Sequence, residues 1–293
     1  MTAERPFAVV PAPDADRVSA LRTELDPARP DTFPGFGEPA RDSLRSACAA
    51  LADDQGGRTA DEASEHLAAI CDAARSLDPN ALTPRRGLGG LFDSRSRRLK
   101  RMREAFLSTD RRLASLSDEL GARIAGLKSR AAALEPRQDA LRTPIVELGA
   151  WLEAGRQRLA DALDEAPEGE ASPRQHLSDR LERLAASRMA ALGQLPLVRI
   201  LQNADVAAAD RLEAAASAVQ AWRDDWRQAL GLEGKRRRKV QPEPSVLSGF
   251  TDRLDAAAQR ARSALEEGRA RRTRVAERLD ELNRSLGETP SAE

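Results

Sequence analysis

A seven-residue repeat of apolar side chains runs through the middle of this chain. Seven residues are close to two turns of an α-helix, so the repeat returns each side chain to the same helix face. Only a long helix that packs against other helices needs such a repeat. Its members are Leu99, Phe106, Leu113, Leu120, Leu127, Leu134, Leu141 and Leu148. The repeat predicts an all-α fold, an elongated bundle of long antiparallel helices with coiled-coil character.

The composition supports this fold and limits the partners. Charged residues make up 32% of the 293 residues and aromatic residues 3%, which is typical of helical bundles. Because 47 basic residues balance 47 acidic ones, no global field attracts nucleic acid, and an anionic partner must meet a local patch. Residues 1–10 lack a basic region followed by an apolar one, so we expect no leader peptide, and no apolar run approaches the roughly 20 residues that cross a bilayer. We therefore expect a cytoplasmic protein.

Three regions follow from the placement of prolines and helical periodicity. Residues 1–38 are rich in proline and predict a disordered or extended N-terminal tail. Residues 39–82 hold two short amphipathic segments, which predict a helical hairpin. Residues 83–290 form the body of long helices. A second heptad stretch begins at Leu247, and because two such stretches can pack on each other, both a monomer and a homodimer fit the sequence.

Prolines fall inside two of the expected long helices. Pro136 and Pro144 lie within the heptad repeat, although a proline costs about 3 kcal/mol in a helix interior. Either the helix kinks without losing its phase, or it ends near Glu135 and a new helix begins; we favour the kinked helix. A further helix from about Arg174 is expected to be interrupted near Pro196.

A basic segment precedes and enters the heptad helix. Gly87, Gly89 and Gly90 follow two arginines and predict a loop, which either cradles a phosphate or forms a turn with a basic rim. The loop lacks the Gly-Lys-Ser/Thr ending of a P-loop, and no strand precedes it. The candidate residues for binding an anion or a partner are Arg85, Arg86, Arg97, Arg98, Lys100 and Arg101.

Cysteines and histidines offer little catalytic chemistry. Cys48 and Cys71 each lie on an apolar helix face, where a free thiol behaves as a small hydrophobic side chain. If the two short helices pair, the thiols could instead form a reactive pair. His66 and His176 have no partner at the spacing of a helical metal site, so we predict no metal site and no catalytic residue.

Three further features have both a structural and a functional interpretation. The basic run from Lys235 to Lys239 indicates a solvated linker, and its alternative is electrostatic binding to nucleic acid or a membrane. No aromatic stacking partners accompany the run, and we consider nucleic acid an unlikely partner. Trp222 and Trp226 lie one helical turn apart and predict core packing. Polar residues in the apolar stretch before them indicate a buried network or an interaction site; they are Arg199, Gln202 and Asn203.

Several of these segments together resemble the toxic anion resistance family, the TelA-like proteins associated with tellurite resistance. The resemblance covers roughly residues 75–290. It implies a mostly helical cytoplasmic accessory protein, peripheral to the inner membrane and acting near membrane-associated partners. Arg199, Gln202, Asn203 and Trp222 match the family motif. The matching segments are Pro-Arg-Arg-Gly-Leu-Gly-Gly-Leu-Phe at 84–92, Arg-Leu-Glu-Arg-Leu at 180–184, Pro-Leu-Val-Arg-Ile-Leu-Gln-Asn at 196–203, Trp222 and Ala-Leu-Gly-Leu at 229–232.

The residues and the resemblance together favour a binding protein. We expect a non-enzymatic helical scaffold that contributes to tellurite resistance or membrane-stress tolerance, binds protein partners and an anionic surface, and needs no cofactor. The alternative is an enzyme that acts by thiol-dependent tellurite reduction or by phosphate-ester hydrolysis.

Overall fold

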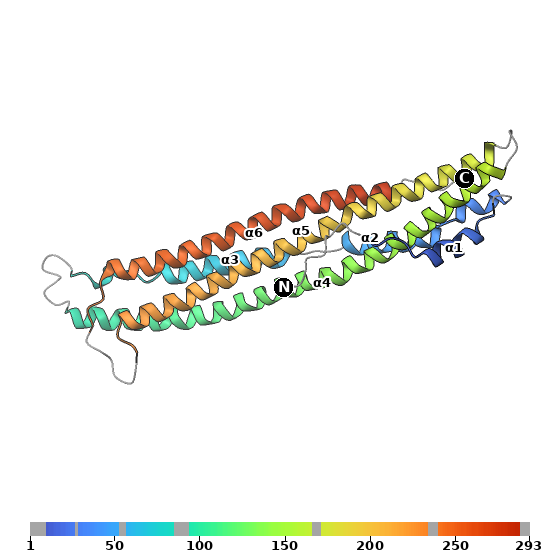
Figure 1. Cartoon of the computed structure of the whole chain (residues 1–293). Helices are drawn as coiled ribbons and strands as arrows, with labels where there is room; N and C mark the ends of the chain where they lie inside the picture. The colour runs from blue at the N-terminus through green and yellow to red at the C-terminus, as the bar shows by residue number, and fades with distance from the viewer. Residues whose placement is uncertain are drawn as a thin grey trace. The chain divides into compact units, whose positions relative to one another are not determined.

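The structure, a computed structural model, describes residues 10–26, 29–52, 57–84, 94–165, 171–233 and 240–287. In these residues it contains α-helices and two short 3-10 helices, and no strand. The predicted all-α fold of long helices is therefore confirmed. The elements, most of them labelled in Figure 1, are α1 (Ala15–Glu24), η1 (Pro30–Gly35), α2 (Glu38–Ala52), α3 (Gly57–Arg75), η2 (Pro79–Leu82), α4 (Arg95–Glu165), α5 (Ala171–Ala229) and α6 (Pro244–Gly287).

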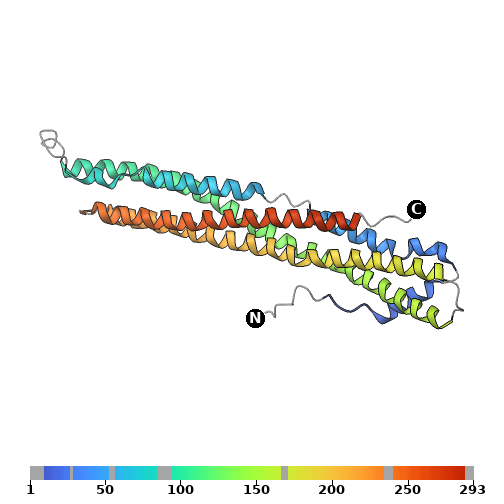
Figure 2. The same ribbon diagram turned by 90° about the horizontal axis from the view of Figure 1, so that it is seen from above.

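The chain divides into two compact units. Unit 1 consists of Met1–Asp54, Ala132–Gln202 and Arg271–Glu293, and unit 2 of Gln55–Ala131 and Asn203–Ala270. The helices α4, α5 and α6 each contribute to both units, whereas α1 and α2 belong to unit 1 and α3 to unit 2. In unit 2, α3 lies alongside the first part of α4, and the second part of α5 lies alongside α6 (Figure 2).

The heptad repeat supplies the core of both units. Its first buried members pack in unit 2 and its later ones in unit 1, while Leu99 packs partly buried against the core of unit 2. The fully buried members are Phe106, Leu113, Leu120, Leu127, Leu134, Leu141 and Leu148. The helix α4 runs through both Pro136 and Pro144, so it does not end at Glu135. Apolar packing on both sides of the prolines stabilises the continuous helix.

An aromatic cluster fills the core of unit 2, as predicted for the tryptophans. The Trp226 ring stacks on Phe106 with a centroid separation of 6.1 Å, and the Trp222 and Trp226 rings are 5.3 Å apart. Both tryptophans are buried. The contacts among these three rings pack α5 against the first part of α4.

The prediction of a disordered or extended tail over residues 1–38 is wrong for the part that the structure describes. That part contains α1 and η1, and Val18 and Leu21 of α1 are buried. The Asp14 carboxylate caps α1 by accepting from the backbone N–H of Asp16 at 2.8 Å. Pro30 is the first residue of η1, where the fixed φ angle of proline is tolerated. The proline-rich composition therefore did not prevent this segment from folding.

Three other expectations need correction. The helices α2 and α3 do not share one hairpin core, since α2 packs in the core of unit 1 and α3 in that of unit 2. The predicted long-helix body over 83–290 is likewise shared between the two units. The helix α5 is not interrupted near Pro196. Pro196 is exposed, while Leu195 and Val198 beside it are buried, so packing offsets the lost backbone hydrogen bond.

Candidate functional site

The basic residues at the start of α4 form an exposed positive surface in unit 2. Arg95, Arg97, Lys100 and Arg101 are all exposed, and the first turn of α4 contains no acidic residue. The free N–H groups of a helix N-terminus carry a partial positive charge, so these cations lie where the helix dipole is unfavourable to them. The other two predicted residues of this surface, Arg85 and Arg86, lie outside the described residues, as does the glycine loop.

The structure gives two arginines near this surface a structural role. The Arg98 Nε donates to the carbonyl oxygen of Leu82 at 3.2 Å, and the Arg103 Nε donates to that of Leu230 at 2.8 Å. Arg98 thereby joins α4 to the end of η2, and Arg103 joins α4 to the end of α5. Arg98 should therefore be separated from the exposed residues in any test of anion binding.

The structure brings only part of the family motif together. The Arg199 Nη1 donates to the Gln202 Oε1 at 2.6 Å within α5, and Asn203 is the next residue and exposed. Trp222 lies in the core of unit 2, where its Nε1 donates to the Thr251 Oγ1 at 3.1 Å. Trp222 thus has a packing role, whereas Arg199, Gln202 and Asn203 form a small polar group on α5.

Both thiols are buried in the helical cores, Cys48 in unit 1 and Cys71 in unit 2. Burial raises the pKa of the Cys48 thiol to about 12 and that of Cys71 to about 11. A thiolate is the reactive form of cysteine, so such pKa values suppress nucleophilic and redox reactivity. The prediction that the cysteines act as small hydrophobic side chains is confirmed.

The histidines are placed differently from each other. The His66 Nδ1 lies 2.6 Å from the carbonyl oxygen of Glu62, and its Nε2 lies 2.5 Å from the Glu119 carboxylate. These two acceptors raise the pKa of His66. His176 is exposed on α5. Within the described ranges, no group of three potential metal-ligating side chains is found. The basic run Lys235–Lys239 lies outside the described residues.

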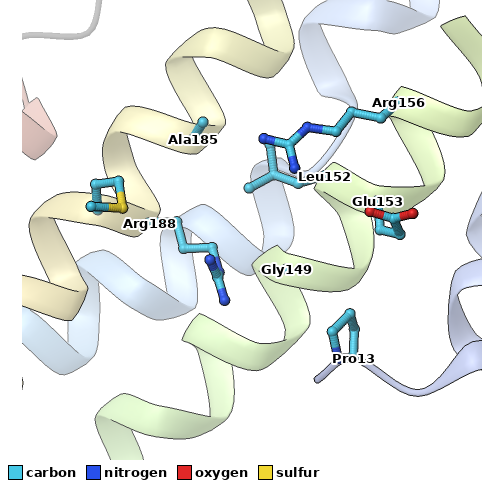
Figure 3. A pocket seen from close by; sticks show the side chains of 8 residues that line it. Pro13, Gly149, Leu152, Glu153, Arg156, Ala185 and Arg188 are labelled. Carbon is cyan, nitrogen blue, oxygen red and sulfur yellow. The ribbon is translucent and has the colours of Figure 1, made fainter. Parts of the chain in front are cut away.

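Sequence reasoning missed a pair of arginines in unit 1. A pocket between α4 and α5 is lined by Arg156 and Glu153 of α4 and by Arg188 of α5 (Figure 3). Its other lining residues are Pro13, Gly149, Leu152, Ala185 and Met189. The spacing of Gly149, Leu152 and Arg156 places them on one helix face, but no pattern indicates that Arg188 lies opposite, because it comes 32 positions after Arg156.

Comparisons with known proteins agree with the family resemblance of the sequence. A family model described as toxic anion resistance protein (TelA) matches residues 18–258. Protein KlaB of Escherichia coli is 26% identical over 241 residues, which cover 75% of this chain and 64% of KlaB. The chain therefore matches less than two thirds of the length of that relative. No solved structure matches the chain. Among the described residues, no helix combines the length and the apolar character that crossing a membrane requires.

Proposed function

Because this chain belongs to the toxic anion resistance (TelA) family, we propose that it contributes to resistance against tellurite or related membrane stress as a non-enzymatic helical scaffold. In this function its long helices bind protein partners. The basic start of α4 binds the anionic surface of the inner membrane from the cytoplasm. This function requires no cofactor.

The proposal rests on the exposed cations at the start of α4. Arg97, Lys100 and Arg101 are exposed in two successive turns, and Glu104 lies within ion-pair distance of Lys100, at 4.0 Å. A basic residue close to an anionic leaflet contributes about 1 kcal/mol to binding, so these three contribute about 3 kcal/mol. An anionic surface also relieves the repulsion between the three cations and the helix dipole.

Liposome co-sedimentation tests the surface. The variant R97E/K100E/R101E reverses the exposed charges and leaves Arg98 in place, because Arg98 joins α4 to η2. We expect the wild type to sediment with phosphatidylglycerol vesicles, and the variant to lose this binding.

A matched control reverses the same number of exposed basic residues elsewhere in unit 2. Arg112, Arg211 and Arg260 are exposed and lie on α4, α5 and α6. The variant R112E/R211E/R260E should bind vesicles as the wild type does, after circular dichroism has shown that both variants are helical. Equal binding by all three proteins would end the proposal of an anionic surface at the start of α4.

The enzymatic alternative makes different predictions. Because burial raises the pKa values of Cys48 and Cys71 to about 12 and about 11, we expect both thiols to react slowly with an alkylating reagent at about pH 8 and rapidly after unfolding in urea. We also expect C48S/C71S to protect cells from tellurite as well as the wild type. Rapid alkylation of the native protein with loss of protection by C48S/C71S would favour thiol-dependent reduction. Turnover in a phosphate-ester panel with divalent metals would favour hydrolysis.

A further inference from the structure

The pocket between α4 and α5 in unit 1 is lined by two like charges, those of the exposed Arg156 and of Arg188. Figure 3 shows the side chains of Arg156 and Arg188 extending from these two helices into the space between them. Arg188 is half-buried, and its burial together with the positive charge of Arg156 lowers its pKa. Two guanidinium groups repel each other here, and a bound anion would remove this repulsion.

Neither arginine is neutralised within the part of the chain that the structure describes. The Arg188 Nε donates to the carbonyl oxygen of Ile145 at 3.2 Å, and neither guanidinium forms an ion pair with a carboxylate of the described residues. Glu153 also lines the pocket, but its Oε1 accepts from the Gln157 Nε2 at 3.0 Å. The pocket thus contains two positive charges and one negative charge.

Three other arginines of the same unit form ion pairs with carboxylates. Arg17 forms an ion pair with Glu147 at 2.6 Å, and Arg22 forms one with Asp161 at 2.6 Å. The buried Arg180 is 3.0 Å from Glu38. Each of these three arginines is accompanied by a carboxylate, whereas Arg156 and Arg188 form no ion pair within the described part of the chain.

Gly149 determines how Arg188 lies against α4. A Cβ atom at position 149 would be 3.3 Å from the Arg188 Nε and 3.5 Å from its Nη2, so the guanidinium packs against the glycine backbone. The carbonyl of Ile145 uses the Nε–H. Because a guanidinium has five N–H donors, the remaining donors can bind oxygen atoms in a fork geometry.

We propose that this pocket binds a small, multiply charged oxyanion between the guanidinium groups of Arg156 and Arg188. The pocket measures about 210 Å³, against about 30 Å³ for a water molecule in the liquid, so an oxyanion fits with some of its water. The buried Leu152 lines the pocket beside the guanidinium groups, and an apolar neighbour lowers the local dielectric and strengthens the attraction. The site lies in unit 1, whereas the basic start of α4 lies in unit 2, so the two binding functions can fail independently.

Isothermal titration calorimetry of the full chain at low ionic strength tests the site, with inorganic phosphate and tellurite as probes and chloride as the monovalent comparison. We expect phosphate or tellurite to bind more tightly than chloride. The variant R156Q/R188Q should bind the same oxyanion at least about tenfold more weakly, because both charge-assisted donors are lost. Without an anion it should be at least as stable as the wild type, since the repulsion is also lost.

The control variant R112Q/R211Q removes one exposed arginine from each of the same two helices, outside the pocket. It should bind phosphate and tellurite as the wild type does. No binding of either probe to the wild type, or equal binding by R156Q/R188Q, would overturn the proposal. A second arm uses phosphatidic-acid vesicles, and binding of these vesicles through Arg156 and Arg188 without binding of the free ions would overturn the assignment to a free oxyanion.

Discussion

The two tryptophans of unit 2 differ in one hydrogen bond. Both are buried, but the Trp222 Nε1 donates to the Thr251 Oγ1 at 3.1 Å, whereas the Trp226 Nε1 has no hydrogen-bond partner in the described part of the chain. A buried donor without a partner costs about 1–3 kcal/mol. Replacing each tryptophan by phenylalanine should therefore have different effects on the free energy of unfolding.

The magnitudes follow from volume and hydrogen bonding. Replacing indole by phenyl removes about 40 Å³, which at about 24 cal/mol per Å³ costs about 1 kcal/mol at either position. W222F also loses a hydrogen bond worth about 1 kcal/mol, for a total of about 2 kcal/mol. W226F instead removes the unpaired donor and keeps a ring that stacks on Phe106, so the gain of about 1–3 kcal/mol offsets the cavity. W226F should be neutral or stabilising by up to about 2 kcal/mol.

Equilibrium unfolding in urea, followed by far-ultraviolet circular dichroism, measures the difference. The midpoints are comparable when the slopes with urea concentration agree. The variant T251V serves as a control, because it removes the acceptor and should couple with W222F by about 1 kcal/mol but not with W226F. A loss of stability in W226F equal to or larger than that in W222F would refute the reasoning.

Two further predictions concern stability. G155A should destabilise the protein, because a Cβ atom at Gly155 would clash with a methyl carbon of the buried Leu181. A Cβ atom at Gly121 meets no atom within 4 Å, so G121A should stabilise α4 by about 0.5–1 kcal/mol. Thermal unfolding of both variants measures the difference. The Glu62 carbonyl and the Glu119 carboxylate raise the pKa of His66 above 6.5. The stability that His66 contributes is thus fully present below about pH 6.5 and is lost as the pH rises through the folded pKa. We expect a loss of at most about 1 kcal/mol, because Glu119 is exposed, and none in H66Q, as measured by urea unfolding across this pH range.

The sequence could predict the helices because helix formation and burial depend on nearby residues. The seven-residue repeat identified α4, and seven of its eight members are fully buried. The phase that survives Pro136 and Pro144 indicated one continuous helix. The spacing of Trp222 and Trp226 was enough to predict that they pack in a core. Proline content was a poorer guide, because it led to a predicted tail where α1 folds and to a predicted break at Pro196.

The sequence likewise predicts some features of the candidate sites and not others. A run of basic residues at a helix start is visible in the sequence, since its members are neighbours in the chain. The sequence does not show that Arg98 binds the Leu82 carbonyl, because that contact depends on how η2 meets α4.

The sequence by itself determined that this protein is a set of long amphipathic helices with buried thiols and a basic helix start, because each of these features rests on residues a few positions apart. Only the tertiary structure decided which helix faces meet. It placed Cys48 and Cys71 in different cores and brought Arg188 of α5 opposite Arg156 of α4. The physical reason is that a heptad pattern specifies an apolar face but leaves open the partner and the register, which depend on the packing of the whole face.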